Sequence, residues 1–200
     1  MSGSEPNGGP AAAEKSRRPA RDRIFETARE MFYKHGIRAV GVETIAAEAG
    51  ATKMSLYRNF PSKDELVAEV LREQSREAFD WWDEVTAGED DPREKIAALF
   101  EALAGKNCCE ESHGCALGNA AVEIHEPDHP ARLVAHEHKR ETHRRLLQMA
   151  HAAGAETDDL GDALMLLMEG GYMARVTLSP KGPVRNLAGA ARALMRAYLD

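Results

Sequence analysis

Apolar residues recur every three to four positions along most of this 200-residue chain, and this spacing is the feature that most restricts its fold. A period of this length is typical of amphipathic α-helices. No segment alternates convincingly between apolar and polar residues, as a half-buried strand would, and no internal repeat is visible. The pattern therefore predicts an all-α protein.

Glycines divide the first part of this pattern into short helices. An amphipathic segment begins at Arg21 and ends before Gly36. Two shorter helices are expected next, over residues 42–49 and about 52–60, and Gly50 separates them. Two short helices joined at a glycine are typical of a helix-turn-helix.

A capping box marks the start of a longer helix. The Ser62 hydroxyl can accept a hydrogen bond from the amide of Glu65, whose carboxylate can reach back to the start of the helix. The apolar pattern then continues to about Thr86, a length of about 36 Å, which is enough to join a head to a separate body. Further helices are expected at residues 93–105, 115–125, 129–153, 158–178 and 184–199.

Charge is distributed very unevenly along the chain. The net charge is −7, but the first 63 residues hold eleven Lys and Arg against seven Asp and Glu, a local charge of +4. The remainder holds 15 basic and 26 acidic residues, a charge of −11. Because salt screens the field of the acidic part over roughly 8 Å, the basic N-terminal third remains suited to nucleic acid.

The first twenty residues are rich in glycine, proline and alanine and have too little apolar surface to fold, so we expect a disordered basic arm. Its arginines, with those that follow, either enter a minor groove or form a solubilising tail; they are Arg17, Arg18, Arg21 and Arg23. No apolar run is long enough to span a bilayer and no signal-type segment is visible, so a cytoplasmic location is expected.

The two short helices carry apolar residues on one side and polar residues on the other. The residues expected to face inward are Ile45, Ala46, Ala49, Leu56 and Phe60. The outward positions of the second helix are Thr52, Lys53, Ser55, Tyr57, Arg58 and Asn59. Side chains that can all form hydrogen bonds suit phosphates and base edges in a major groove.

This string of residues resembles the N-terminal signature of the TetR (tetracycline-repressor-like) family over about residues 21–70. The matching features are Ile45-Ala46, Ala49-Gly50, Leu56-Tyr57, Phe60, Ser62-Lys63 and Leu66. The resemblance implies that Tyr57 and Lys63 contact phosphates, while residues 52–59 meet the groove. The candidate DNA-binding residues are therefore Thr44, Thr52, Lys53, Ser55, Tyr57, Arg58, Asn59 and Lys63. The chain departs from the family at Gly41, Met54 and Asn59, where threonine, glycine and an aromatic residue are frequent.

The resemblance also implies a function and a division into domains. We expect a disordered arm at 1–20, a DNA-binding domain at 21–66, and an effector-binding and dimerisation domain at 67–200. The implied activity is that of a ligand-responsive regulator, a repressor of palindromic double-stranded DNA operators that a small-molecule effector releases. Homodimerisation also follows from the DNA side, because palindromic half-sites require two-fold symmetry.

The last two helices carry apolar and small residues, with one charged exception, on one side. These are Leu160, Ala163, Leu164, Leu167, Met168, Gly171 and Arg175, then Leu187, Ala190, Ala191, Leu194 and Tyr198. In proteins that resemble this one, such a pair forms a four-helix interface with a second subunit. The alternative is that this side closes the core of the monomer.

A second stretch, residues 114–123 followed by Asp128-His129-Pro130, is similar to a segment beside the presumed effector cavity in one group of TetR-like regulators. Asn119 and Glu123 would project from one face of a helix, either toward a ligand or into structural hydrogen bonds. The candidate effector-binding residues are Trp82, Phe100, Leu103, Cys115, Asn119, Glu123, Met168 and Tyr172. Several of these residues are equally suited to an ordinary apolar core.

Cysteines and histidines concentrate in the middle of the chain and suggest an alternative. Cys108, Cys109 and Cys115 lie close together, and seven of the eight histidines fall between His113 and His151. A metal- or thiol-responsive regulator would use such residues, although no paired CxxC spacing is present. The segment with His136, His138 and His143 has the lysines and arginines of a solvated face.

No bound metal, cofactor or enzymatic activity is expected. The chain has none of the common nucleophile, phosphate-binding or dinucleotide-binding motifs. A helix-turn-helix that binds protein instead of DNA is a further alternative. Only DNA binding should weaken steeply as salt rises, and this distinguishes the two.

Overall fold

A computed structural model describes residues 18–106, 113–179 and 181–200, and all regular structure in these ranges is helical. The expectation of an all-α protein is confirmed. Residues 1–17 of the expected arm, together with Cys108 and Cys109, lie outside the described residues. The described helices divide between two compact units, a head unit up to Val70 and a body unit from Leu71 to Asp200.

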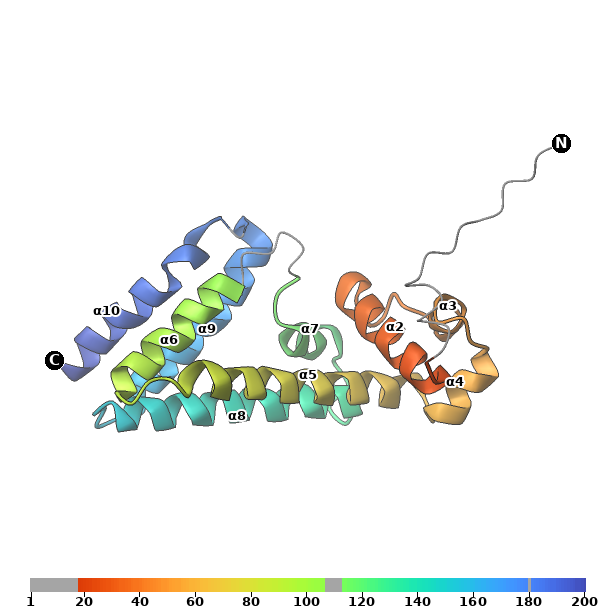
Figure 1. Ribbon diagram of the computed structural model, residues 1–200, viewed down its shortest axis with the longest axis horizontal. Helices are drawn as coiled ribbons and strands as arrows, with labels where there is room; N and C mark the ends of the chain where they lie inside the picture. The colour runs from red at the N-terminus through yellow and green to blue at the C-terminus, as the bar shows by residue number, and fades with distance from the viewer. Residues whose placement is uncertain (1–17, 107–112, 180) are drawn as a thin grey trace. The chain divides into compact units, whose positions relative to one another are not determined.

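The head unit contains three helices and the start of a fourth (Figure 1). These are α2 (Ala20–His35), α3 (Val42–Glu48), α4 (Lys53–Asn59) and the first part of α5 (Lys63–Thr86). The five residues expected to face inward are all buried, and Ile45, Leu56 and Phe60 are at most 1% exposed. Ile24 of α2 and Leu66 of α5 are also fully buried.

Local signals fix the turn between α3 and α4. Gly50 has a φ of +59°, in the left-handed region where a side chain is disfavoured. The Thr52 hydroxyl then caps α4 by accepting a hydrogen bond from the Ser55 amide at 3.1 Å. At the start of α5, the Ser62 hydroxyl accepts from the Glu65 amide at 3.0 Å, as the capping box predicts.

The body unit comprises the rest of α5 with α6 (Pro92–Lys106), α7 (Ala116–Glu123), α8 (Pro130–Ala152), α9 (Asp159–Leu178), a 3₁₀ turn η1 (Pro183–Asn186) and α10 (Leu187–Leu199). Helix α10 packs against α6 and α9, and α8 packs against the same two helices (Figure 1). These helices contribute to one core cluster, which includes Phe100, Leu146 and Leu164 together with Trp82 of α5. Close packing of α8 against α9 depends on Gly161, because a Cβ there would lie 2.9 Å from the Leu147 Cα.

Sequence analysis left two interpretations of the apolar side of the last two helices, an interface with a second subunit or the core of the monomer. The structure shows where most of these residues lie. Leu160, Leu164, Met168, Gly171, Leu187 and Ala191 are buried and, apart from Gly171, belong to the core cluster of the body unit. The apolar side chains that α9 leaves exposed lie elsewhere on the helix, at Leu166, Met173, Val176 and Leu178. Most of the named side therefore closes the core of the monomer, and an interface between the helix pairs of two subunits stays a prediction. Helix α10 also begins later than expected, since η1 covers residues 183–186.

In the portion of the chain that the structure describes, no helix combines the length and the apolar character that crossing a membrane requires.

Candidate functional site

The exposed side of α4 is the candidate DNA-binding surface. Lys53, Tyr57 and Arg58 are exposed, and Thr44 is exposed on the neighbouring helix α3. Met54 is 72% exposed on the same side of α4. Met54 was not among the predicted DNA contacts, although an apolar residue within a row of polar residues could have indicated that it belongs to this surface. A methionine there can contact the methyl group of thymine, as other apolar side chains do.

Hydrogen bonds inside the head unit engage several of the expected DNA contacts. Asn59 donates from Nδ2 to the Ser55 carbonyl at 2.8 Å, and Thr52 caps the helix. The Lys53 ammonium pairs with Glu43 of α3, and this hydrogen bond lowers the pKa of Glu43 and raises that of Lys53. The first two contacts stabilise α4 itself and the Lys53–Glu43 pair joins α4 to α3, while Tyr57 and Arg58 remain exposed.

Lys63 is placed differently from the other candidates. Its ammonium donates to the Ile37 carbonyl at 2.6 Å, so it ties the start of α5 to the loop between α2 and α3. Its role as a phosphate contact stays a prediction. The observed bond assigns it at least a structural role in the head unit.

Two of the four arginines expected in a flexible arm have structural roles instead. Arg23 donates from Nε to the Ala49 carbonyl at 2.9 Å and from Nη2 to the Gly50 carbonyl at 3.1 Å. It therefore satisfies carbonyls at the end of α3, directly before the turn. Arg21 pairs with Glu69 and lies over the Phe60 ring. The expectation that these two belong to an arm was wrong, because both fold onto the head unit.

The candidate effector residues divide into three groups. Trp82, Leu103, Met168 and Tyr172 line a small cavity of about 50 Å³ in the body unit. Phe100 is fully buried in the core next to it. Cys115 caps α7 by accepting from the Gly118 amide, and Asn119 donates to the His113 carbonyl at 2.7 Å. Glu123 is half-buried at the end of α7.

Lys139 of α8 connects two of these groups. Its ammonium lies 2.6 Å from Glu169 Oε1, 3.4 Å from the Cys115 sulfur and 5.8 Å from the centre of the Tyr172 ring. Burial lowers the pKa of Lys139, but its contacts with Cys115 and Glu169 outweigh burial and raise it overall. The cavity wall therefore holds a cation whose charge Glu169 compensates.

His138 is the clearest polar residue that pattern reasoning misplaced. It was expected on a solvated face, but it is 8% exposed, accepts or donates at Nδ1 with Ser75 at 2.8 Å, and packs on Phe79. Burial, and next the charge of Lys139, lower its pKa to about 4. The buried stripe of α8 could have revealed it; its members are Ala131, Val134, Ala135, His138, Thr142, Leu146 and Ala150.

The metal- or thiol-responsive alternative gains no support from this arrangement. Among the described residues, no three histidine, cysteine or acidic side chains come together as a metal site would require. Cys115 has a capping role, and the other two cysteines lie outside the described ranges.

Comparison with known proteins identifies the head unit. Residues 24–70 match the sequence model of the bacterial regulatory proteins of the tetR family. The transcriptional regulator LmrA of Bacillus subtilis is 25% identical over 174 residues, which cover 84% of this chain and 93% of that protein. The transcriptional repressor KstR2 of Mycolicibacterium smegmatis is 37% identical over 82 residues, 41% of this chain and 40% of that protein.

A solved structure gives the same assignment for the fold. SCO4454, a TetR-family transcriptional regulator from Streptomyces coelicolor, superposes with a TM-score of 0.85 at 24% identity, covering 90% of this chain and 96% of that one. The similarity thus extends over both units, while the family model matches the part that contains α3 and α4. The chain is a DNA-binding transcriptional regulator of the tetR family.

Proposed function

We propose that the chain is a homodimeric repressor that binds palindromic operators through α4 and leaves them when a small molecule binds the body unit. The observation that carries the proposal is the exposed row of hydrogen-bonding side chains on α4, held by Arg23 and the Lys53–Glu43 pair. Such side chains can contact both phosphates and base edges. We assign the protein no catalytic activity and place it in the cytoplasm, where a regulator reaches chromosomal DNA.

Selection of duplexes from a random pool tests the DNA-binding part. We expect the selected sites to be inverted repeats, with recognition helices about one turn of DNA apart, roughly 34 to 36 Å, or a multiple of it. Footprints without two-fold symmetry would contradict a palindromic operator. The variant Arg58→Gln should weaken binding, whereas Arg196→Gln, a charge change on the exposed side of α10, should not.

Exposed apolar residues support the homodimer. Leu166 is 74% exposed and Met173 is 58% exposed, and they lie seven residues apart on α9, on one side of the helix. Exposed apolar side chains that share one side of a helix are typical of an interface. The variant Leu166→Glu should give monomers in analytical ultracentrifugation, while Val122→Glu, at a residue of α7 that is 72% exposed, should remain dimeric. Monomeric wild-type protein at micromolar concentration would contradict the proposal.

Helix α5 supports the ligand response, because one continuous helix carries Lys63 at its start and Trp82 near its end. A ligand that binds one conformation of α5 better than another shifts the population by its differential affinity. Linkage then requires that operator and effector weaken each other by the same factor, typically about 5- to 150-fold. Equal effector affinity with and without saturating operator would refute this mechanism.

A further inference from the structure

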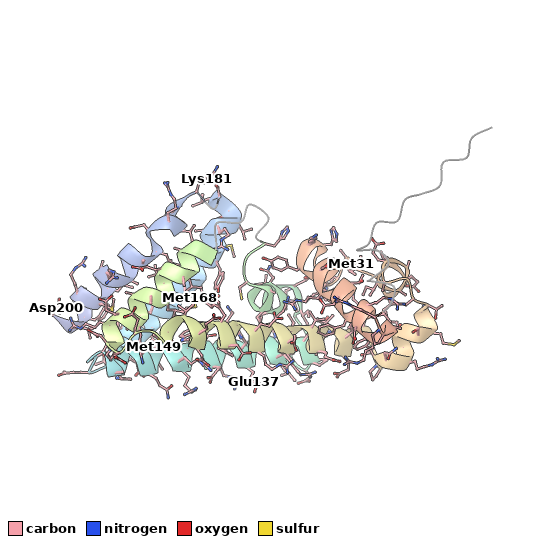
Figure 2. The ribbon with its side chains drawn as sticks, viewed as in Figure 1. Met31, Glu137, Met149, Met168, Lys181 and Asp200 are labelled. Atoms are coloured by element: carbon pink, nitrogen blue, oxygen red, sulfur yellow. The ribbon has the colours of Figure 1, made fainter. Side chains whose placement is uncertain are left out.

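Two hollows in the body unit meet at one side chain. The small cavity of about 50 Å³ is partly open and has a largely aromatic wall from α5, α8 and α9, which includes Phe79, Trp81 and Tyr172. An open groove of about 430 Å³ lies between the end of α5, the start of α6 and the end of α8. Trp82 lines both hollows and is only 7% exposed. Figure 2 labels Met149 of α8, which lines the groove, and Met168 of α9, which lines the cavity.

The volumes show why neither hollow is a complete ligand site. A dry cavity of about 150 Å³ holds a molecule as small as benzene, so one of about 50 Å³ holds none. The groove is within the range of about 300 to 1,000 Å³ typical of ligand sites, but it is open to solvent and buries one side of a ligand only. A rotation of the Trp82 indole would connect the groove to the aromatic interior.

The groove differs in charge from the strongly acidic part of the chain that contains it. Its charged lining residues are Lys95, Arg144, Arg145 and Asp83. Arg145 is engaged by Asp83 at 2.6 Å and Arg144 by Glu141 at 2.7 Å. Lys95 has no ion-pair partner within the described ranges of the chain. The groove therefore offers an uncompensated ammonium beside the apolar surface of Trp82, Pro92 and Met149.

We propose that this site binds a small organic anion with an aromatic body, with the carboxylate at Lys95 and the body against Trp82, which acts as the gate to the inner cavity. The carboxylate stays in the groove because the cation in the cavity wall, Lys139, is already compensated by Glu169 at 2.6 Å. Its role as effector rests on the proposed ligand-responsive function, but the binding itself is measured without DNA.

Calorimetry on the full-length protein tests the anion class, with 4-phenylbutyrate as the probe and the neutral 4-phenyl-1-butanol as its matched control. We expect the alcohol to bind about fivefold more weakly or worse. The variant Lys95→Gln should weaken the carboxylate about two- to fivefold and leave the alcohol unchanged, as loss of a partly exposed ion pair does. Lys95→Arg should retain binding, and Arg196→Gln serves as the distant charge control. Equal binding of acid and alcohol, or no binding of the acid at millimolar concentration, would overturn the proposal.

Stopped-flow fluorescence tests the gate, because Trp81 and Trp82 are the two tryptophans of the chain. In the Trp81→Phe variant the signal comes from Trp82 alone. We expect the observed rate to saturate with 4-phenylbutyrate concentration, since opening of the gate precedes entry. A rate that rises with concentration and never saturates would show that Trp82 is only a wall.

The two proposals fail in different ways. If the acid binds at Lys95 but operator affinity does not change, the site stands and the ligand-responsive function fails. If operator binding is intact and no acid binds, the site fails and the DNA-binding function stands.

Discussion

The candidate site of the head unit and that of the body unit are built from different kinds of residue sets, one local in sequence and the other dispersed. The surface on α4 comes from one helix, Lys53–Asn59, in which neighbouring residues share a role. The cavity of the body unit comes from four helices, and its lining runs from Ala78 to Tyr172. A surface built from one short helix can be predicted from local periodicity. A cavity built from distant residues depends on how the helices pack, and periodicity does not reveal that.

The largest effect should come from a core residue of the head unit. Leu56→Ala removes a fully buried side chain behind the exposed face of α4, and we expect it to lower the free energy of unfolding of the head unit by about 2–5 kcal/mol. Hydrogen exchange resolved by residue should show faster exchange in α2–α4 and unchanged protection in α9. The control Met54→Ala changes an exposed residue of the same helix and should have almost no effect on stability. Equal loss of protection in both units would contradict their independence.

The next effect concerns the body unit and its response to acid. His138 has a pKa of about 4 in the folded protein against an ordinary value of 6.5, so the unfolded chain binds more protons between these values. The contribution of His138 to the free energy of unfolding is therefore fully present above about pH 6.5. It is lost as the pH falls to about 4, by up to about 3 kcal/mol. Denaturant unfolding at several pH values measures this.

His138→Gln should flatten that pH dependence, and His136→Gln, an exposed residue of the same helix, should preserve it. His151 acts in the opposite sense, because its hydrogen bonds with the Ala155 carbonyl and Asp158 raise its pKa. An unchanged pH profile in His138→Gln would show that the buried imidazole does not control the acid response.

These two regions also show what could be predicted from the sequence. The helix boundaries and the inward side of α3 and α4 followed from apolar spacing, Gly50 and the Ser62 cap. Arg23 could not be placed, because its partners Ala49 and Gly50 are 26 and 27 residues away and no local pattern links them. His138 was misplaced because the charged residues around it in sequence suggest a solvated face, while Ser75 and Phe79 on α5 contact it in the fold.

A smaller effect should follow from Arg23. Arg23→Gln removes the donors to the Ala49 and Gly50 carbonyls, and we expect it to destabilise the head unit by about 1–2 kcal/mol and to weaken operator binding in consequence. Arg23→Lys keeps the charge but loses the forked geometry, so it should restore only part of the stability. Loss of operator affinity without any loss of stability would instead place Arg23 in contact with DNA.

The smallest effect should be that of a single phosphate contact. Tyr57 is 45% exposed on α4, and Tyr57→Phe should weaken binding about three- to tenfold on every operator alike, because a phosphate contact carries no sequence information. Lys63→Ala should also act equally on all operators, with an added loss of head stability from its bond to Ile37. Gel-shift titrations across several operators check both variants, and a loss confined to one operator would assign the residue to base recognition.

The dependence of operator affinity on salt tests the central claim, that the exposed side of α4 binds DNA, most directly. Titrations of a selected operator between 50 and 200 mM salt should show affinity falling steeply, by about 10³-fold if the dimer neutralises about six phosphates. Arg58→Gln, which removes one cation from each α4, should reduce the slope of log affinity against log salt by about 1 per subunit, whereas Arg196→Gln should leave it unchanged. An affinity that does not change over this range, or a slope that Arg58→Gln leaves intact, would contradict the account.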